Sequence, residues 1–122
     1  MDIHDLTDLI RFSDDAPNTE TLLETERLWS QVICLQDSQG IGPLSDAGAD
    51  GLLVVLAGEV AVQIGKGRSR LRQWGGVVVP AGEELTIRNA SSEPGVVLVV
   101  TAPPPGAGED GAAAYEGPDA TT

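Results

Sequence analysis

The fold is decided by two stretches, Gly51-Leu-Leu-Val-Val-Leu-Ala-Gly-Glu-Val-Ala-Val-Gln-Ile-Gly65 and Trp74-Gly-Gly-Val-Val-Val-Pro-Ala-Gly82. In the first, apolar residues at 60, 62 and 64 alternate with Ala61 and Gln63, which is the period of a half-buried strand. Gly65-Lys-Gly67 follows as a tight hairpin turn, because glycine supplies the positive φ that such turns need. The two stretches therefore predict hairpin arms of a small β-barrel.

The flanking sequence adds further strands. Residues 28–36 are largely apolar and end at the turn Asp37-Ser-Gln-Gly40, residues 85–89 alternate, and residues 96–101 form a β-branched run. Residues 41–50 are loop-like with one extended piece, and residues 19–27 suit either a strand edge or a loop. The pattern predicts an all-β domain.

The two ends of the chain differ from the centre. Ile3, Leu6, Leu9 and Ile10 recur at helical spacing and predict a short N-terminal helical arm lying against the barrel. Consecutive prolines after residue 102 cannot donate to a β-ladder, and residues 103–122 are rich in Gly, Ala and acids, so we expect a disordered tail. The predicted domain is 1–102, with the barrel at about 28–102.

Charge and composition narrow the possible partners. The 122 residues carry a net charge of -12, which disfavours nucleic acid and anionic membrane surfaces as partners. No apolar run approaches the roughly 18 residues of a membrane span, and the N-terminus is acidic, so we expect a cytoplasmic protein. The one cysteine, Cys34, and the one histidine, His4, lack the partners that a nucleophile or a metal ligand needs, so Cys34 is expected to be a small strand residue.

Basic residues gather in one place. Four of the seven basic residues recur at every second position: Lys66, Arg68, Arg70 and Arg72. This spacing places them on one strand face, while Leu71 points inward. This face is either the solvated outer side of a strand or a surface that binds an anion or an acidic partner.

Several of these pieces together resemble a known family. Val55-Leu-Ala-Gly-Glu59, an alternating strand, a Gly-rich turn, another strand, and Val78-Val-Pro-Ala-Gly82 with Asn89 seven residues on are similar to the small single-domain cupins. The resemblance covers about residues 28–102. It implies a double-stranded β-helix, also called a jelly-roll barrel, and a homodimer.

The resemblance also assigns the metal-ligand positions of that family. The first motif has two histidines flanking one residue, then a glutamate, then a glycine; with the glycine at Gly58, the glutamate position is Gly51 and the histidine positions are Leu44 and Asp46.

In the second motif, Pro80, Gly82 and Asn89 match, whereas the histidine position is Leu85 and Trp74 stands where a glycine is expected. One Asp among four positions is too few donors for a metal, so we predict no metal, no cofactor and none of the family's metal-dependent chemistry.

Two functional hypotheses follow for the interior of the barrel. Leu44 and Leu85 would make it apolar, giving either a packed core or a pocket for a small apolar or acidic metabolite, with Asp46, Trp74 and Arg88 near its mouth. If the interior is packed, the function belongs to the outer surface or to the dimer interface. If Trp74 does not contact a ligand, we expect it to pack in the core or an interface, as we expect for Trp29.

The alternatives to a binding module are an enzyme and a protein-interaction unit. A metal-independent isomerase, epimerase or cyclase would need Asp46 or Asp50 as its base, but no second proton-transfer group accompanies them, so we expect no catalysis. An interaction unit would use the basic strand face of residues 66–72 to bind an acidic partner.

Overall fold

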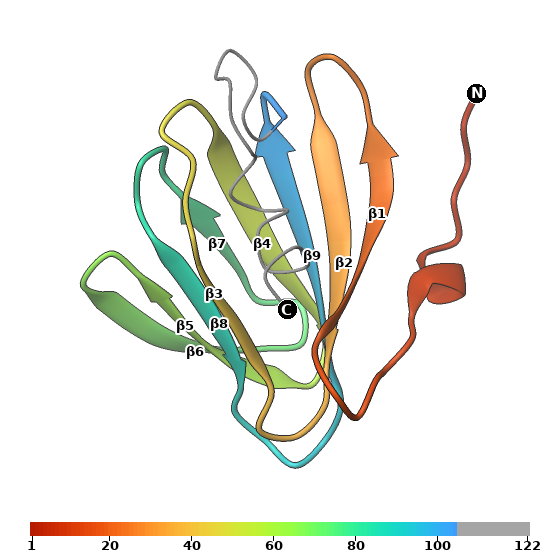
Figure 1. Ribbon diagram of the computed structural model, residues 1–122, viewed down its shortest axis with the longest axis vertical. Coiled ribbons are helices and arrows are strands. Elements are labelled where there is room, and N and C mark those ends of the chain that lie inside the picture. Colours follow the sequence, from red (N-terminus) through yellow and green to blue (C-terminus); the bar gives the residue numbers. More distant parts are fainter. Residues whose placement is uncertain (105–122) are drawn as a thin grey trace.

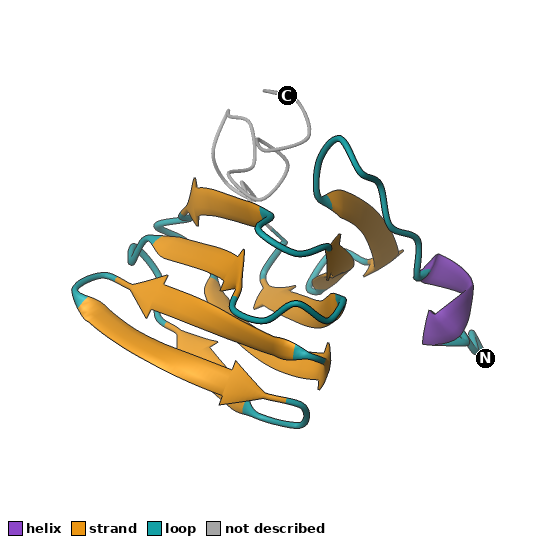
Figure 2. Ribbon diagram, turned by 90° about the horizontal axis from the view of Figure 1, so that it is seen from below, coloured by secondary structure: helices purple, strands orange, loops and turns teal. Residues whose placement is uncertain are grey.

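The computed structural model describes residues 1–104 as two antiparallel sheets packed face to face (Figure 1, Figure 2). The five-stranded sheet has the order β1 (Asn18–Glu24), β2 (Trp29–Leu35), β9 (Gly95–Ala102), β4 (Asp50–Ala57) and β7 (Gly76–Val79). The four-stranded sheet has the order β3 (Gly40–Leu44), β8 (Leu85–Asn89), β5 (Glu59–Ile64) and β6 (Gly67–Arg72). The all-β jelly-roll prediction is confirmed.

The prediction of a barrel needs a correction, because the two sheets are not closed into one. Within the described residues, the edge strands β1 and β7 of one sheet do not pair with the edge strands β3 and β6 of the other. Each sheet instead buries one face against the other, which is how a two-sheet jelly roll covers its apolar side chains.

The decisive stretch of the sequence forms β4 and β5, one strand in each sheet. Gly58 joins them with a φ of +79°, and a Cβ there would lie 2.5 Å from the carbonyl oxygen of Pro94. Only glycine fits this crossing between sheets without strain. The predicted hairpin between β5 and β6 is confirmed, with Gly65 at a φ of +57°.

The core lies between the two sheets and consists mainly of Val, Leu and Ile. Its buried members are Trp29, Ile33, Leu35, Ile41, Leu44, Leu53, Val55, Val60, Val62, Val79, Leu85, Ile87, Val97 and Val99. Trp29 therefore packs in the core, as the sequence predicts. The alternation in β5 is also confirmed, because Val60 and Val62 belong to this cluster while Ala61 and Gln63 face away from it.

The N-terminal arm covers part of the outer face of the five-stranded sheet. It forms the short 3-10 helix η1 (Leu6–Leu9), in which the Asp5 carboxylate accepts hydrogen bonds from the backbone N–H and the hydroxyl of Thr7. These bonds lower the pKa of Asp5. Contacts to the sheet come from Leu6, Leu9 and Ile10, whereas Ile3, predicted on the same face, is exposed because it precedes the helical turn.

The arm packs over Val32, Cys34 and Val96. Cys34 is fully buried there, as expected for a strand residue, and burial raises the pKa of its thiol. No helix in residues 1–104 is long and apolar enough to cross a membrane. From residue 105 onward, the predicted tail lies outside the described residues.

Candidate functional site

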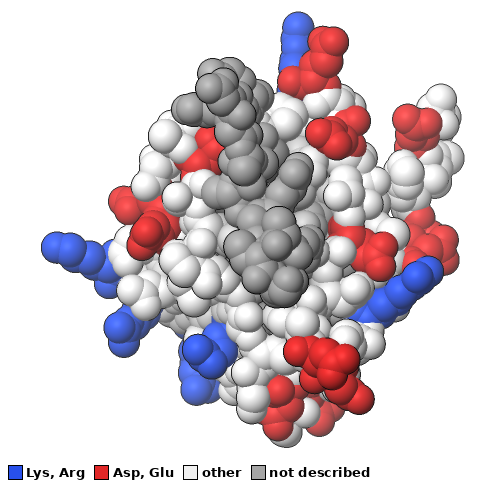
Figure 3. Space-filling model, viewed as in Figure 1, with Lys and Arg blue, Asp and Glu red and all other residues white. Residues whose placement is uncertain are grey.

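The basic row lies on β6, an edge strand of the four-stranded sheet. Arg68, Arg70 and Arg72 are exposed on its outer face, while Leu71 packs against the core, as the spacing predicts. Figure 3 shows basic side chains along the side of the molecule where β5 and β6 lie. An outward row of arginines on an edge strand also discourages pairing with another chain.

The strand order brings one further arginine to this row. β5 lies between β6 and β8, so Ala61 pairs with Arg70 on one side and with Arg88 on the other. In the same way, Gln63 pairs with Arg68 and with Thr86. Leu85 and Ile87 on β8 point into the core, which leaves Thr86 and Arg88 facing outward.

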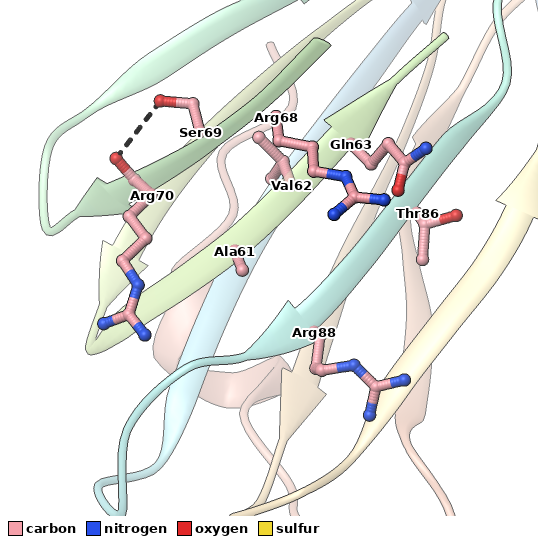
Figure 4. A pocket seen from close by; sticks show the side chains of 8 residues that line it. All are labelled: Ala61, Val62, Gln63, Arg68, Ser69, Arg70, Thr86 and Arg88. Atoms are coloured by element: carbon pink, nitrogen blue, oxygen red, sulfur yellow. Dashed lines mark hydrogen bonds between the residues drawn. The ribbon is translucent and has the colours of Figure 1, made fainter. Parts of the chain in front are cut away.

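These outward residues line an open depression of about 520 Å³ (Figure 4). Its lining includes Ala61, Gln63, Arg68, Arg70, Thr86 and Arg88. A second depression of about 420 Å³ shares Ala61, Arg70 and Arg88 with the first and continues toward the loop after β8. We call the surface formed by Arg68, Arg70 and Arg88 around Ala61 the arginine face.

The charges of the arginine face are only lightly neutralised. Arg70 lies 3.4 Å from Glu59, Nη1 to Oε2, in a mostly exposed pair of the kind that contributes little. Arg68 and Arg88 form no ion pair with any described residue. The surface therefore offers guanidinium donors to an anion from solvent.

Two of the residues predicted to bind a ligand lie in the core. Leu44 and Leu85 are direct partners in the β3–β8 register and are 1% and 0% exposed. The structure thus brings this pair together, as neighbours in the hydrophobic cluster. A role in lining a ligand pocket stays a prediction.

Asp46, the candidate base, lies in the loop between β3 and β4. Its carboxylate accepts a hydrogen bond of 2.8 Å from the backbone N–H of Gly48, and its carbonyl accepts one of 2.8 Å from Gly82. The second bond ties this loop to the turn after β7. Asp50 similarly accepts a bond of 3.0 Å from the backbone N–H of Ala81. Asp46 thus joins two loops, Asp50 joins the start of β4 to the same turn, and a catalytic role for either stays a prediction.

The other two predicted residues lie apart from this loop. Trp74 is 73% exposed in the turn between β6 and β7, with a φ of +74°, so it does not pack in the core. Its backbone N–H bonds to the Val55 carbonyl. Arg88 lies on the outer side of β8, across the strand from the buried Leu85. The structure therefore does not gather the predicted residues at one mouth.

No protein-family model matches the sequence, and no curated protein matches it either. Solved structures do. The protein TT1209 of Thermus thermophilus is 31% identical, with a TM-score of 0.81 over 86% of this chain and 100% of that one. An RmlC-like cupin protein from Desulfovibrio desulfuricans is 24% identical, with a TM-score of 0.74 over 85% of this chain and 98% of its own.

An uncharacterised protein with a double-stranded β-helix domain from Klebsiella pneumoniae has a TM-score of 0.77 at 22% identity, over 83% of this chain and 89% of its own. The chain belongs to the small cupins. In this cupin the metal-ligand positions of the family are occupied by Leu44, Asp46, Gly51 and Leu85.

Those residues do not fit a metal. Leu44 and Leu85 are packed hydrocarbon, Gly51 has no side chain, and Asp46 is the one donor among the four positions. In the part of the chain that the structure describes, no three His, Cys, Asp or Glu side chains come together where they could hold one ion. We derive no metal-dependent step for this cupin.

Sequence reasoning missed that Arg88 belongs with the basic row, because it placed Arg88 at the mouth of the interior. The alternation of apolar and polar side chains in residues 85–89 was the available signal. Leu85 and Ile87 are apolar and Thr86 and Arg88 are polar, so Arg88 had to face outward. That alternation does not reveal the order of the strands, which places β8 and β6 on either side of β5.

Proposed function

We propose that this cupin is a non-catalytic binding module that holds a small acidic metabolite on the arginine face. The observation that carries the proposal is the convergence of Arg68, Arg70 and Arg88, from two strands, on one depression of about 520 Å³. That volume is within the range of pockets that hold small molecules. The family's metal positions, by contrast, carry residues that suit packing.

Electrostatics supports the same ligand class. The chain has a net charge of -12, so a local group of arginines is the surface to which an anion is drawn, while anions are repelled elsewhere. Arg68 and Arg88, without ion pairs in residues 1–104, have guanidinium donors available. Gln63 and Thr86 add neutral hydrogen-bonding groups to the same depression.

A second candidate is an interaction unit for an acidic polypeptide. It is favoured by the length of the basic row, because Lys66, which lies in the turn before β6 and not on the strand as predicted, and Arg72, at the end of β6, lie beyond the residues that line the depression. An extended acidic segment would contact the whole row, whereas a small metabolite would contact its middle. Substitution of Lys66 and Arg72 therefore separates the two candidates.

We also propose that the protein forms a homodimer. The outer face of the five-stranded sheet supports this, because Leu52 and Val78 pair directly across β4 and β7 and are 43% and 63% exposed. Adjacent exposed apolar side chains of this kind mark surfaces that associate. Light scattering behind size exclusion tests the mass, and a monomer across micromolar concentrations would contradict the proposal.

The binding proposal is tested by calorimetric titration with citrate. The triple variant Arg68→Gln/Arg70→Gln/Arg88→Gln should lose binding, and Lys66→Gln/Arg72→Gln should keep it. The matched control is Arg11→Gln/Arg27→Gln, which removes cations outside the face. Equal citrate affinity in the wild type and the triple variant would refute the proposal.

A further inference from the structure

We propose that Arg70 and Arg88 form a clamp across Ala61 that holds one oxyanion group of the ligand, a carboxylate or a phosphate. The inference rests on the proposed binding function and adds the chemical group that is recognised and the residues that recognise it. The juxtaposition comes from the sheet, because both arginines are direct cross-strand partners of the same alanine.

The spacing of the strands suits such a clamp. Neighbouring strands lie about 4.8 Å apart, so residues on the two strands that flank β5 are separated by roughly 10 Å at the backbone. Ala61 places a single methyl group between them. Two arginine side chains can therefore lean inward over the methyl and donate to one small anion from both sides, with no larger side chain in the way.

Figure 4 shows Arg70 and Arg88 on either side of Ala61, and both depressions on this face include all three residues. In this view neither guanidinium points toward Ala61, and Nη1 of Arg70 contacts Oε2 of Glu59 at 3.4 Å, so the clamp forms when both side chains turn inward around the anion. A planar guanidinium donates two parallel hydrogen bonds to a carboxylate or phosphate. The face therefore offers up to four charge-assisted hydrogen bonds to one oxyanion.

The neighbouring set of cross-strand partners, two residues along each strand, would hold the remainder of the ligand. Arg68, Gln63 and Thr86 lie side by side there, about 7 Å along the strands from the clamp. The Gln63 amide N–H₂ already donates to the carbonyl of Gly65 at 3.2 Å, which orients its oxygen as an acceptor. The ligand class is thus an acid with a hydroxyl or second acidic group about 7 Å from the first.

Glu59 competes with the ligand for one side of the clamp. Its carboxylate contacts Arg70 at 3.4 Å, and it adds negative charge beside the depression. Binding of an anion must displace this contact or share Arg70 with it. Glu59→Gln should therefore raise the affinity for phosphate about two- to threefold, which is the size expected for an exposed ion pair.

The deciding experiment titrates inorganic phosphate and, separately, acetate into the ¹⁵N-labelled full-length protein, with the arginine Nε–Hε and backbone signals observed by NMR. Ala61→Glu places a carboxylate between the two arginines, where it occupies the clamp from within. This variant should lower anion affinity about tenfold or more, since it removes charge-assisted hydrogen bonds. Ala61→Gln adds nearly the same bulk without the charge, so it should bind phosphate several-fold more tightly than Ala61→Glu, and the difference between the two variants measures the effect of the added carboxylate.

Ala61 faces away from the core, so both variants should fold, and their backbone spectra check this. The response to phosphate against acetate distinguishes the source of the oxyanion. Unchanged phosphate binding in Ala61→Glu would overturn the clamp. If the triple arginine variant nevertheless loses citrate binding, the proposed function stands without the clamp, and if both variants bind as the wild type does, both proposals fail.

Discussion

Replacement of Leu85 by alanine tests whether this residue, at a metal-ligand position of the family, is part of a packed core. Leu85 is fully buried and has Leu44 and Ile64 as its cross-strand partners in β3 and β5. Loss of three carbon groups removes about 2.4 kcal/mol of transfer free energy at about 0.8 kcal/mol each. The cavity that remains adds about 1 kcal/mol, so we expect Leu85→Ala to lower the free energy of unfolding by about 3–4 kcal/mol.

Urea denaturation followed by tryptophan fluorescence measures this change. With a slope of about 1–1.5 kcal/mol per molar, the midpoint should fall by roughly 2–4 M. The matched control is Leu28→Ala, because Leu28 is 36% exposed, lies outside the proposed dimer surface and should cost about 1 kcal/mol or less. If Leu85→Ala costs no more than Leu28→Ala, the packing argument is refuted and the predicted interior ligand pocket gains support.

Three further predictions concern the loops and the thiol. Asn89→Ala should cost about 2–3 kcal/mol in urea denaturation, because the amide donates to the carbonyls of Leu35 at 3.1 Å and Glu93 at 2.9 Å; a cost under about 0.5 kcal/mol would contradict this role. Gly58→Ala should cost about 2–4 kcal/mol by the same assay, because its Cβ would clash with the Pro94 carbonyl. Gly82→Ala, with a φ of +87° and no atom near its Cβ, should cost only the backbone strain of about 1 kcal/mol. Equal costs for the two variants would show that the contact with Pro94 is irrelevant. Cys34 should resist iodoacetamide in the folded state. Because burial raises the pKa of its thiol above that of the unfolded chain, about 8.5, the free energy of unfolding should fall as the pH rises above about 8.5 in the wild type but not in Cys34→Ala.

The strands that were predicted well are those whose side chains alternate or form apolar runs. Residues 28–36 became β2 and residues 85–89 became β8, because burial on one or both faces imposes a readable pattern. β1 and β3 were harder. Both are edge strands with little apolar sequence, and β3 contains Pro43, which an edge tolerates because its N–H would have no partner.

Which residues make up the arginine face depended on information that local sequence does not contain. The parity of Arg68, Arg70 and Arg72 predicted their shared face correctly, but pairing of β5 with both β6 and β8 is a property of the whole jelly roll. Arg88 lies 18 positions after Arg70 in the sequence and reaches it only through that pairing. Trp74 shows the opposite case, since a large apolar side chain predicted burial and the turn conformation exposes it.

Arg68, Arg70 and Arg72 lie on an edge strand, which adds a second physical role to the binding proposed for the arginine face. The outer edge of β6 carries backbone groups that could recruit a strand from another molecule, and the alternating cations oppose such pairing between identical chains. Neutral substitutions that abolish ligand binding should therefore also raise the tendency to aggregate. Removal of these cations would therefore have two separable consequences, the loss of the proposed anion site and a less protected sheet edge.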